Sequence, residues 1–309
     1  MDPKVKAATL SVVSNSSLVA MKLAVGLATG SISILSEAAH SALDLFAAII
    51  AFLSVRASGR PADKEHPFGH GKIENLSGAI EAVLILFAAI LIIHESADRL
   101  RHPGRIETIG AGILVMGISA IANALISRYL FKVAHRTDSI ALEADAQHLS
   151  ADVWTSVGVF AGLGFIQITG WHVLDPVVAI LVALMIMRVA FTLTWKAAGP
   201  LLDVRLPDEE VKELENIVMR TPGIVGFHKL RTRKAGSCRE IDYHLIVPAD
   251  MPVVSAHAMA EDIEDKMRDR FPRTTVVTHI EPDTDDTISE PDTAMKDNQL
   301  EDGPPPPSI

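Results

Sequence analysis

Residues 36–46 read SEAAHSALDLF and residues 145–156 read DAQHLSADVWTS, and both segments adjoin long apolar stretches. Each segment places a histidine four positions before an aspartate, His40 with Asp44 and His148 with Asp152. Residues four apart lie on one face of a helix, so each segment predicts an imidazole beside a carboxylate. Two such helices side by side would offer two nitrogen and two oxygen ligands to one four-coordinate metal ion.

The apolar stretches are long enough to cross a membrane. Hydrophobic residues make up 49% of the 309 positions, and a membrane-spanning helix needs about 20 mostly apolar residues. Six segments fit this description: residues 7–29, 34–55, 76–95, 109–130, 152–169 and 173–195. Because ionisable side chains inside a membrane are costly and usually functional, the two histidine–aspartate pairs predict a metal site on a transport path.

The chain changes character after the last apolar run. We expect a transmembrane domain over residues 1–206, a small soluble domain over 207–283 and a tail over 284–309. The soluble part predicts helices over 207–219 and 253–271 and strands over 225–233, 239–247 and 275–280. The predicted fold class is therefore an all-α membrane domain of six transmembrane helices plus a small α+β domain.

The cysteine count excludes two kinds of cross-link, and the composition of the tail predicts disorder. With only Cys238, the chain forms no intrachain disulfide and no multi-cysteine zinc cluster. Residues 285–309 hold seven acidic residues and one lysine and end in a run of prolines. This composition is typical of a disordered acidic tail.

The distribution of lysine and arginine predicts the orientation in the membrane. Basic residues gather before the first span, between the second and third, around the fourth-to-fifth connection and after the sixth. The connections at residues 30–33 and 170–172 carry none, although Arg99, Arg101 and Arg105 disagree with the pattern. The positive-inside rule then places both termini in the cytoplasm of a multi-pass inner-membrane protein.

The ligand types indicate which metal fits. Two imidazoles and two carboxylates suit tetrahedral Zn²⁺, whereas calcium or magnesium would take more oxygens, and Cu(I) prefers thiolates. Iron, cobalt and manganese stay open. A metal ligand must lose its proton, so metal binding is linked to proton release and predicts metal/proton exchange. Glu81 and Arg188 also lie in apolar runs, and we expect them to pair or to relay protons.

Five segments together resemble the cation diffusion facilitator family: residues 36–46, 66–74 (HPFGHGKIE), 145–156, 201–210 (LLDVRLPDEE) and 227–233 (FHKLRTR). The resemblance implies six transmembrane helices, a homodimer, a ferredoxin-like (metallochaperone-like) cytoplasmic domain and alternating access driven by protons. It places His40, Asp44, His148 and Asp152 at the transport site. Many bacterial members carry aspartate where this chain has His40, and the histidine form is similar to that of zinc-selective transporters.

The loop between the second and third spans holds a second candidate site. Asp63, His66 and His70 lie three and four positions apart, a spacing that brings ligands together in a helical turn, although Pro67 and Gly69 favour a loop. A solvated loop is the alternative, and the resemblance implies a zinc site. It also implies that Lys72 and Asp203 form an interlocking ion pair; otherwise they are unrelated charges near the membrane surface.

Histidines also accumulate in the soluble domain. His279 and Glu281 lie two apart, so on a strand they share one face. Scattered histidines are more often surface residues, whereas the resemblance implies a binuclear zinc site at five positions, with Glu281 where aspartate is common. These residues are His228, His244, His257, His279 and Glu281.

Several functions remain open from the sequence. The leading prediction is a Zn²⁺/H⁺ antiporter that exports zinc from the cytoplasm, and the alternatives are an exporter of Fe²⁺, Cd²⁺ or another divalent metal, or a membrane-anchored metal sensor. The chain lacks the H-E-x-x-H pattern, and four protein ligands leave no open position for a catalytic water, so we expect no enzyme. The expected partners are divalent metal ions, protons, lipid and a second copy of the chain, with no nucleic acid.

Overall fold

A computed structural model describes residues 2–101, 110–169 and 174–284 of the chain. The chain forms two compact units, residues 1–202 and 203–309, and each is described by itself. The predicted tail over 284–309 lies outside the described residues, apart from its first position.

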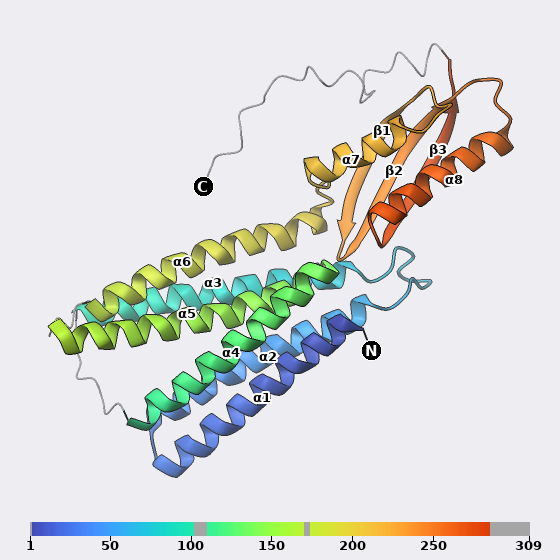
Figure 1. Ribbon diagram of the computed structural model, residues 1–309. Coiled ribbons are helices and arrows are strands. Elements are labelled where there is room, and N and C mark those ends of the chain that lie inside the picture. The colour runs from blue at the N-terminus through green and yellow to red at the C-terminus, as the bar shows by residue number, and fades with distance from the viewer. Residues whose placement is uncertain (1, 102–109, 170–173, 285–309) are drawn as a thin grey trace. The chain divides into compact units, whose positions relative to one another are not determined.

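The first unit contains six long helices among its described residues (Figure 1). They are α1 (Pro3–Thr29), α2 (Ile32–Ser58), α3 (Lys72–Arg101), α4 (Gly110–Thr137), α5 (Ile140–Thr169) and α6 (Leu174–Ala198), and a short 3₁₀ turn, η1 (Gly199–Leu202), ends the unit. Five of these helices, all except α5, are long and apolar enough to cross a membrane. The helical transmembrane architecture is confirmed, and the sixth span stays a prediction.

Helix α5 begins well before the predicted span. It starts at Ile140, whereas the sequence predicted the span from residue 152. Glu143 and Asp145 interrupt the apolar run, yet small and apolar side chains on both sides of them are buried, among them Ala141, Leu142 and Ala146. Tertiary burial, not the local run of apolar residues, therefore decides where this helix begins.

Small side chains let the six helices pack closely. One core joins α1, α2, α4 and α5 and includes Ala7, Ala8, Ala141 and Ala146. A second core joins α3, α5 and α6 through residues such as Ala82, Ala144 and Ala190. Small residues at helix interfaces are typical of membrane proteins, because hydrocarbon supplies no hydrophobic force between helices and van der Waals contact must hold them together.

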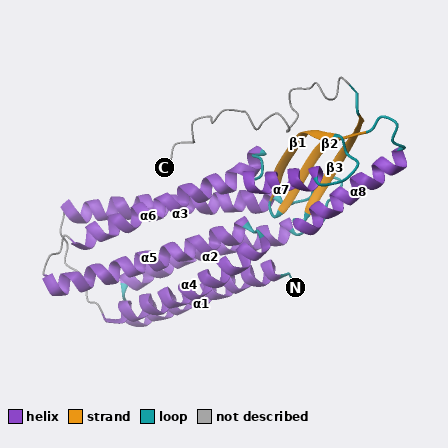
Figure 2. Cartoon of the chain, turned by 45° about the horizontal axis from the view of Figure 1, so that its top comes forward, coloured by secondary structure: helices purple, strands orange, loops and turns teal. Residues whose placement is uncertain are grey.

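The second unit has the predicted order of elements (Figure 2). They are α7 (Asp208–Met219), β1 (Gly226–Ala235), β2 (Cys238–Val247), α8 (Val253–Arg270) and β3 (Thr274–Pro282). Strand β2 is central, antiparallel to β1 and parallel to β3. A small α+β unit with a three-stranded sheet is thus confirmed, and its ferredoxin-like classification stays a prediction.

The two faces of this sheet differ in chemistry. Tyr243 and Leu245 of β2 are buried in a core that includes residues of both α7 and α8. Because side chains alternate along a strand, His244 points to the opposite face. The register pairs His244 with His228 of β1 and with His279 of β3, so three histidines lie abreast on the face away from the core.

Candidate metal sites

The first candidate site lies between α2 and α5, as the sequence predicted. Ligand atoms of His40, Asp44 and Asp152 all lie within 4.8 Å of one another. His148 joins them through Nε2, which lies 3.1 Å from Asp44 Oδ1. The structure therefore brings all four predicted residues together.

Burial at this site differs among the four ligands. Asp44 and His148 are 5% and 9% exposed, whereas the side chain of His40 is about half exposed. Sequence reasoning missed Asn123 of α4, whose Nδ2 lies 3.5 Å from Asp152 Oδ2. It also missed a contact of Lys22 on α1, which is buried and donates a hydrogen bond from Nζ to Ser41 Oγ at 2.8 Å. A single polar residue in an apolar helix gives no signal of which helix it faces.

The expected pairing of Glu81 with Arg188 is not found. Glu81 is fully buried, and neither of its carboxylate oxygens accepts a hydrogen bond from any residue that the structure describes. Arg188 is exposed on the surface of α6. The sequence showed that both charges lie in apolar runs, but it could not show that they face different directions.

The second candidate site is the loop between α2 and α3. Ligand atoms of Asp63, His66 and His70 lie within 4.8 Å of one another. Asp63 Oδ1 accepts hydrogen bonds from the backbone N–H groups of His66 and Glu65, at 2.7 and 3.0 Å, and Oδ2 lies 3.3 Å from His70 Nε2. The bond from the His66 backbone is the main reason why the pKa of Asp63 is below its usual value. The loop therefore holds an ionised carboxylate against two imidazoles.

The third candidate site is on the face of the sheet away from the core of the second unit. Glu281 lies at the centre, since Oε2 is 2.8 Å from His228 Nε2 and Oε1 is 2.8 Å from His244 Nδ1. His279 Nε2 lies 3.5 Å from the same Oε1, which agrees with the predicted shared face. Burial raises the pKa of Glu281, but the hydrogen bonds with His228 and His244 lower it, and the net pKa is below the usual value.

His257 does not lie with the other four residues of this site. It is exposed on α8, and its Nε2 lies 3.4 Å from Glu261 Oε1, one turn along the same helix. The structure thus brings together four of the five predicted residues. The part played by His257 stays a prediction.

The chain matches two family models. One, the cation efflux transmembrane domain, matches residues 8–202, and the other, the cytoplasmic domain of cation efflux proteins, matches residues 206–283. The chain belongs to the cation efflux family. Its six long helices and its small α+β unit are thus the two halves of a cation transport protein of this family.

Curated relatives extend over most of this cation efflux protein. An uncharacterized transporter of Synechocystis is 35% identical over 277 residues, 89% of each chain. The cation-efflux pump FieF of Citrobacter koseri is also 35% identical over 277 residues, 90% of this chain and 92% of that one. Among solved structures, the zinc form of CzrB is 31% identical and covers 26% of this chain and 91% of its own, with a TM-score of 0.25.

The two residues of the expected interlock lie in different units of this family member. Lys72 begins α3 of the first unit, and Asp203 begins the second unit. Within the second unit, Asp203 Oδ2 lies 3.4 Å from Arg233 Nη1. A Lys72–Asp203 pair stays a prediction.

Proposed function

We propose that this protein exports divalent metal ions, zinc above all, from the cytoplasm in exchange for protons. The observation that supports this most is the cluster of two imidazoles and two carboxylates between α2 and α5. Within a membrane such a set is costly unless it binds a cation, and its nitrogen and oxygen donors suit tetrahedral Zn²⁺. The family membership supports export as the direction.

The exchange with protons follows from the ligands. His148 and His40 bind metal only as neutral imidazoles, so a proton that occupies a ring nitrogen must leave before a metal ion binds there. Metal and protons then compete for the same atoms as the site faces the two sides of the membrane in turn. A proton gradient directed into the cell would therefore drive metal out.

The second unit is proposed to sit in the cytoplasm and to hold two copies of the chain together. Its match to the cytoplasmic domain of cation efflux proteins supports the location. The Glu281 cluster and the Asp63 loop are proposed as additional zinc sites, because each presents a carboxylate within hydrogen-bonding distance of imidazole nitrogens. Zinc at the Glu281 cluster would strengthen the dimer and report cytoplasmic zinc.

Proteoliposomes with an imposed pH gradient test the proposal. We expect zinc uptake by the wild type, loss of that uptake in Asp44→Asn and in Asp152→Asn, and full uptake in the control Asp242→Asn. Asp242 is a surface carboxylate of β2 that pairs with Arg231 at 2.8 Å. Zinc flux that persists in both site variants, or that ignores the pH gradient, would contradict the proposal.

Export of Fe²⁺ or Cd²⁺ on the same ligands is the second candidate. Relatives named as cation-efflux pumps, without a stated metal, support it. Competition in the same vesicles decides between the candidates. If zinc is the substrate, excess Zn²⁺ should suppress the uptake of Fe²⁺ and of Cd²⁺.

A further inference from the structure

Two carboxylates near the transport cluster have no role in the function proposed above. Glu81 of α3 is fully buried, and Asp145 of α5 is 1% exposed. Both oxygens of Glu81 and Oδ2 of Asp145 lack a hydrogen-bond partner in the described part of the chain. Buried carboxylates with unpaired oxygens are rare, because desolvation of a carboxylate is costly unless a cation or donor compensates it.

Contacts between α3 and α5 show that the two carboxylates lie at the same level. Ser139, just before α5, donates to Glu74 near the start of α3, so the two helices begin together. A Cβ on Gly78 would lie 3.5 Å from the backbone oxygen of Ile140, and one turn further Ala82 and Ala144 share one core. Glu81 and Asp145 are the immediate neighbours of those two alanines. The helices therefore run side by side in the same direction, and the two carboxylates lie at the same level and close enough to repel each other.

The surroundings of the pair contain one further oxygen and no lysine or arginine that acts on either carboxylate. The hydroxyl of Ser11 on α1 faces Asp145, yet its Oγ makes no hydrogen bond of normal geometry. Among described residues, Asp145 is the charged group that acts on Glu81, while α6 presents apolar side chains such as Ile186 and Leu193 to α3. No lysine or arginine among the described residues acts on either carboxylate, and only the imidazole of His148, when protonated, offsets the charge of Asp145.

We propose that Glu81 and Asp145, with the hydroxyl of Ser11, form a second binding site for a divalent metal ion inside the membrane unit. One divalent ion supplies two positive charges, which match the two carboxylates, and it takes up unpaired oxygens from three helices at once. Protons would also neutralise the charge, and the test below separates them from a metal ion.

The position of the site relative to the transport cluster suggests its use. Asp145, His148 and Asp152 lie three and four positions apart, so they follow one another along one face of α5. The proposed site is the next step toward the N-terminal end of α5. It would hold the metal ion immediately before or after the transport cluster, so the inference rests on the proposed function.

The test counts zinc bound per protomer in the full-length protein in lipid nanodiscs, by equilibrium dialysis and elemental analysis. The parent is Asp44→Asn/Asp152→Asn, which disables the transport cluster. Adding Glu81→Gln to the parent should remove one zinc ion per protomer, and adding Asp145→Asn should do the same. The control is Glu143→Gln, two residues from Asp145, whose carboxylate instead pairs with Lys196 at 2.7 Å and which should leave the count unchanged.

Several outcomes separate the possibilities. An unchanged zinc count in both variants overturns the second site. The same is true if the variants change proton release but not the zinc count, since the pair would then bind protons alone. If one variant does not fold, as judged by size-exclusion chromatography, the other decides. The proposed function fails separately, when Asp44→Asn and Asp152→Asn alone leave zinc flux intact.

Discussion

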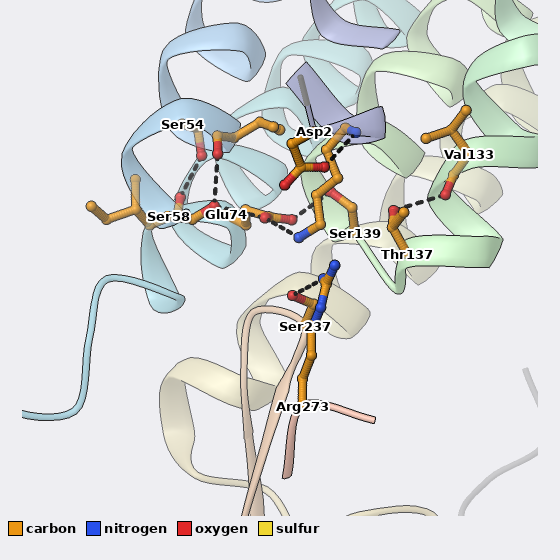
Figure 3. A network of polar contacts seen from close by, with 12 residues as sticks. Asp2, Ser54, Ser58, Glu74, Val133, Thr137, Ser139, Ser237 and Arg273 are labelled. Atoms are coloured by element: carbon orange, nitrogen blue, oxygen red, sulfur yellow. Dashed lines mark hydrogen bonds and ion pairs between the residues drawn. The ribbon is translucent and has the colours of Figure 1, made fainter. Parts of the chain in front are cut away.

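Lys4 Nζ of α1 lies 2.7 Å from Glu74 Oε1 of α3, and the two side chains are 6% and 1% exposed. Ser58 of α2 donates to the same oxygen at 2.7 Å, and Ser139 donates to the other carboxylate oxygen (Figure 3). One carboxylate thus joins α1, α2, α3 and the start of α5. All four meet it at the end of the helix bundle where α1, α3 and α5 begin.

Removal of the Glu74 carboxylate should destabilise the membrane unit strongly. Glu74→Ala removes the carboxylate that pairs with the buried Lys4 ammonium, and loss of one member of a buried ion pair costs about 3–5 kcal/mol. Thermal unfolding in detergent should show a large fall in the Tm. The control is Glu143→Ala, which breaks a pair with the exposed Lys196 and should cost no more than about 1 kcal/mol. Equal effects of the two changes would contradict this assignment.

The metal selectivity should depend on His40. Replacing His40 with aspartate changes the donor set from two nitrogens and two oxygens to one nitrogen and three oxygens, while Asp44 and His148 keep their 3.1 Å contact. We expect His40→Asp to retain transport and to admit cadmium beside zinc. Competition between Zn²⁺ and Cd²⁺ in vesicle uptake measures this, and a ratio equal to that of the wild type would show that His40 does not set selectivity.

Zinc binding to the second unit should depend on Glu281, because its two oxygens reach His228 and His244 at 2.8 Å each. Glu281→Gln replaces an ionised ligand by a neutral amide, so zinc affinity at this site should fall while uptake at saturating zinc persists. Calorimetric zinc titration of the full chain detects the loss. Glu261→Gln, next to His257 on α8, is the matched control, and a titration unchanged by Glu281→Gln would remove this residue from the site.

Alkaline pH should destabilise the second unit through Tyr243. Burial raises the pKa of Tyr243 from 10.0 to about 12. Because the folded-state pKa is above the unfolded value, the stabilisation is complete below pH 10 and is lost as the pH rises toward 12. Thermal unfolding followed by circular dichroism measures the decline. Tyr243→Phe should flatten the decline, because phenylalanine carries no ionisable hydroxyl.

The sequence by itself determined which side chains share one face of a helix or strand. The spacing of His40 and Asp44, and of His148 and Asp152, fixes each pair on one helix face because an α-helix repeats every 3.6 residues. The alternation of side chains along a strand likewise predicted that His279 and Glu281 point together. Long apolar runs predicted the helical membrane unit for the same local reason.

Only the tertiary structure decided which faces meet. It brings Glu281 to His228, 53 residues away, while His257 of the same predicted set lies apart on α8. It turns Glu81 inward beside Asp145 and leaves Arg188 on the surface, and it gives Glu74 a partner 70 residues away in Lys4. The pairings in the helical unit depend on how small side chains such as Gly78 and Ala144 let helices approach, and the pairing of Glu281 with His228 depends on the strand order of the sheet. Both are long-range properties that no local pattern contains.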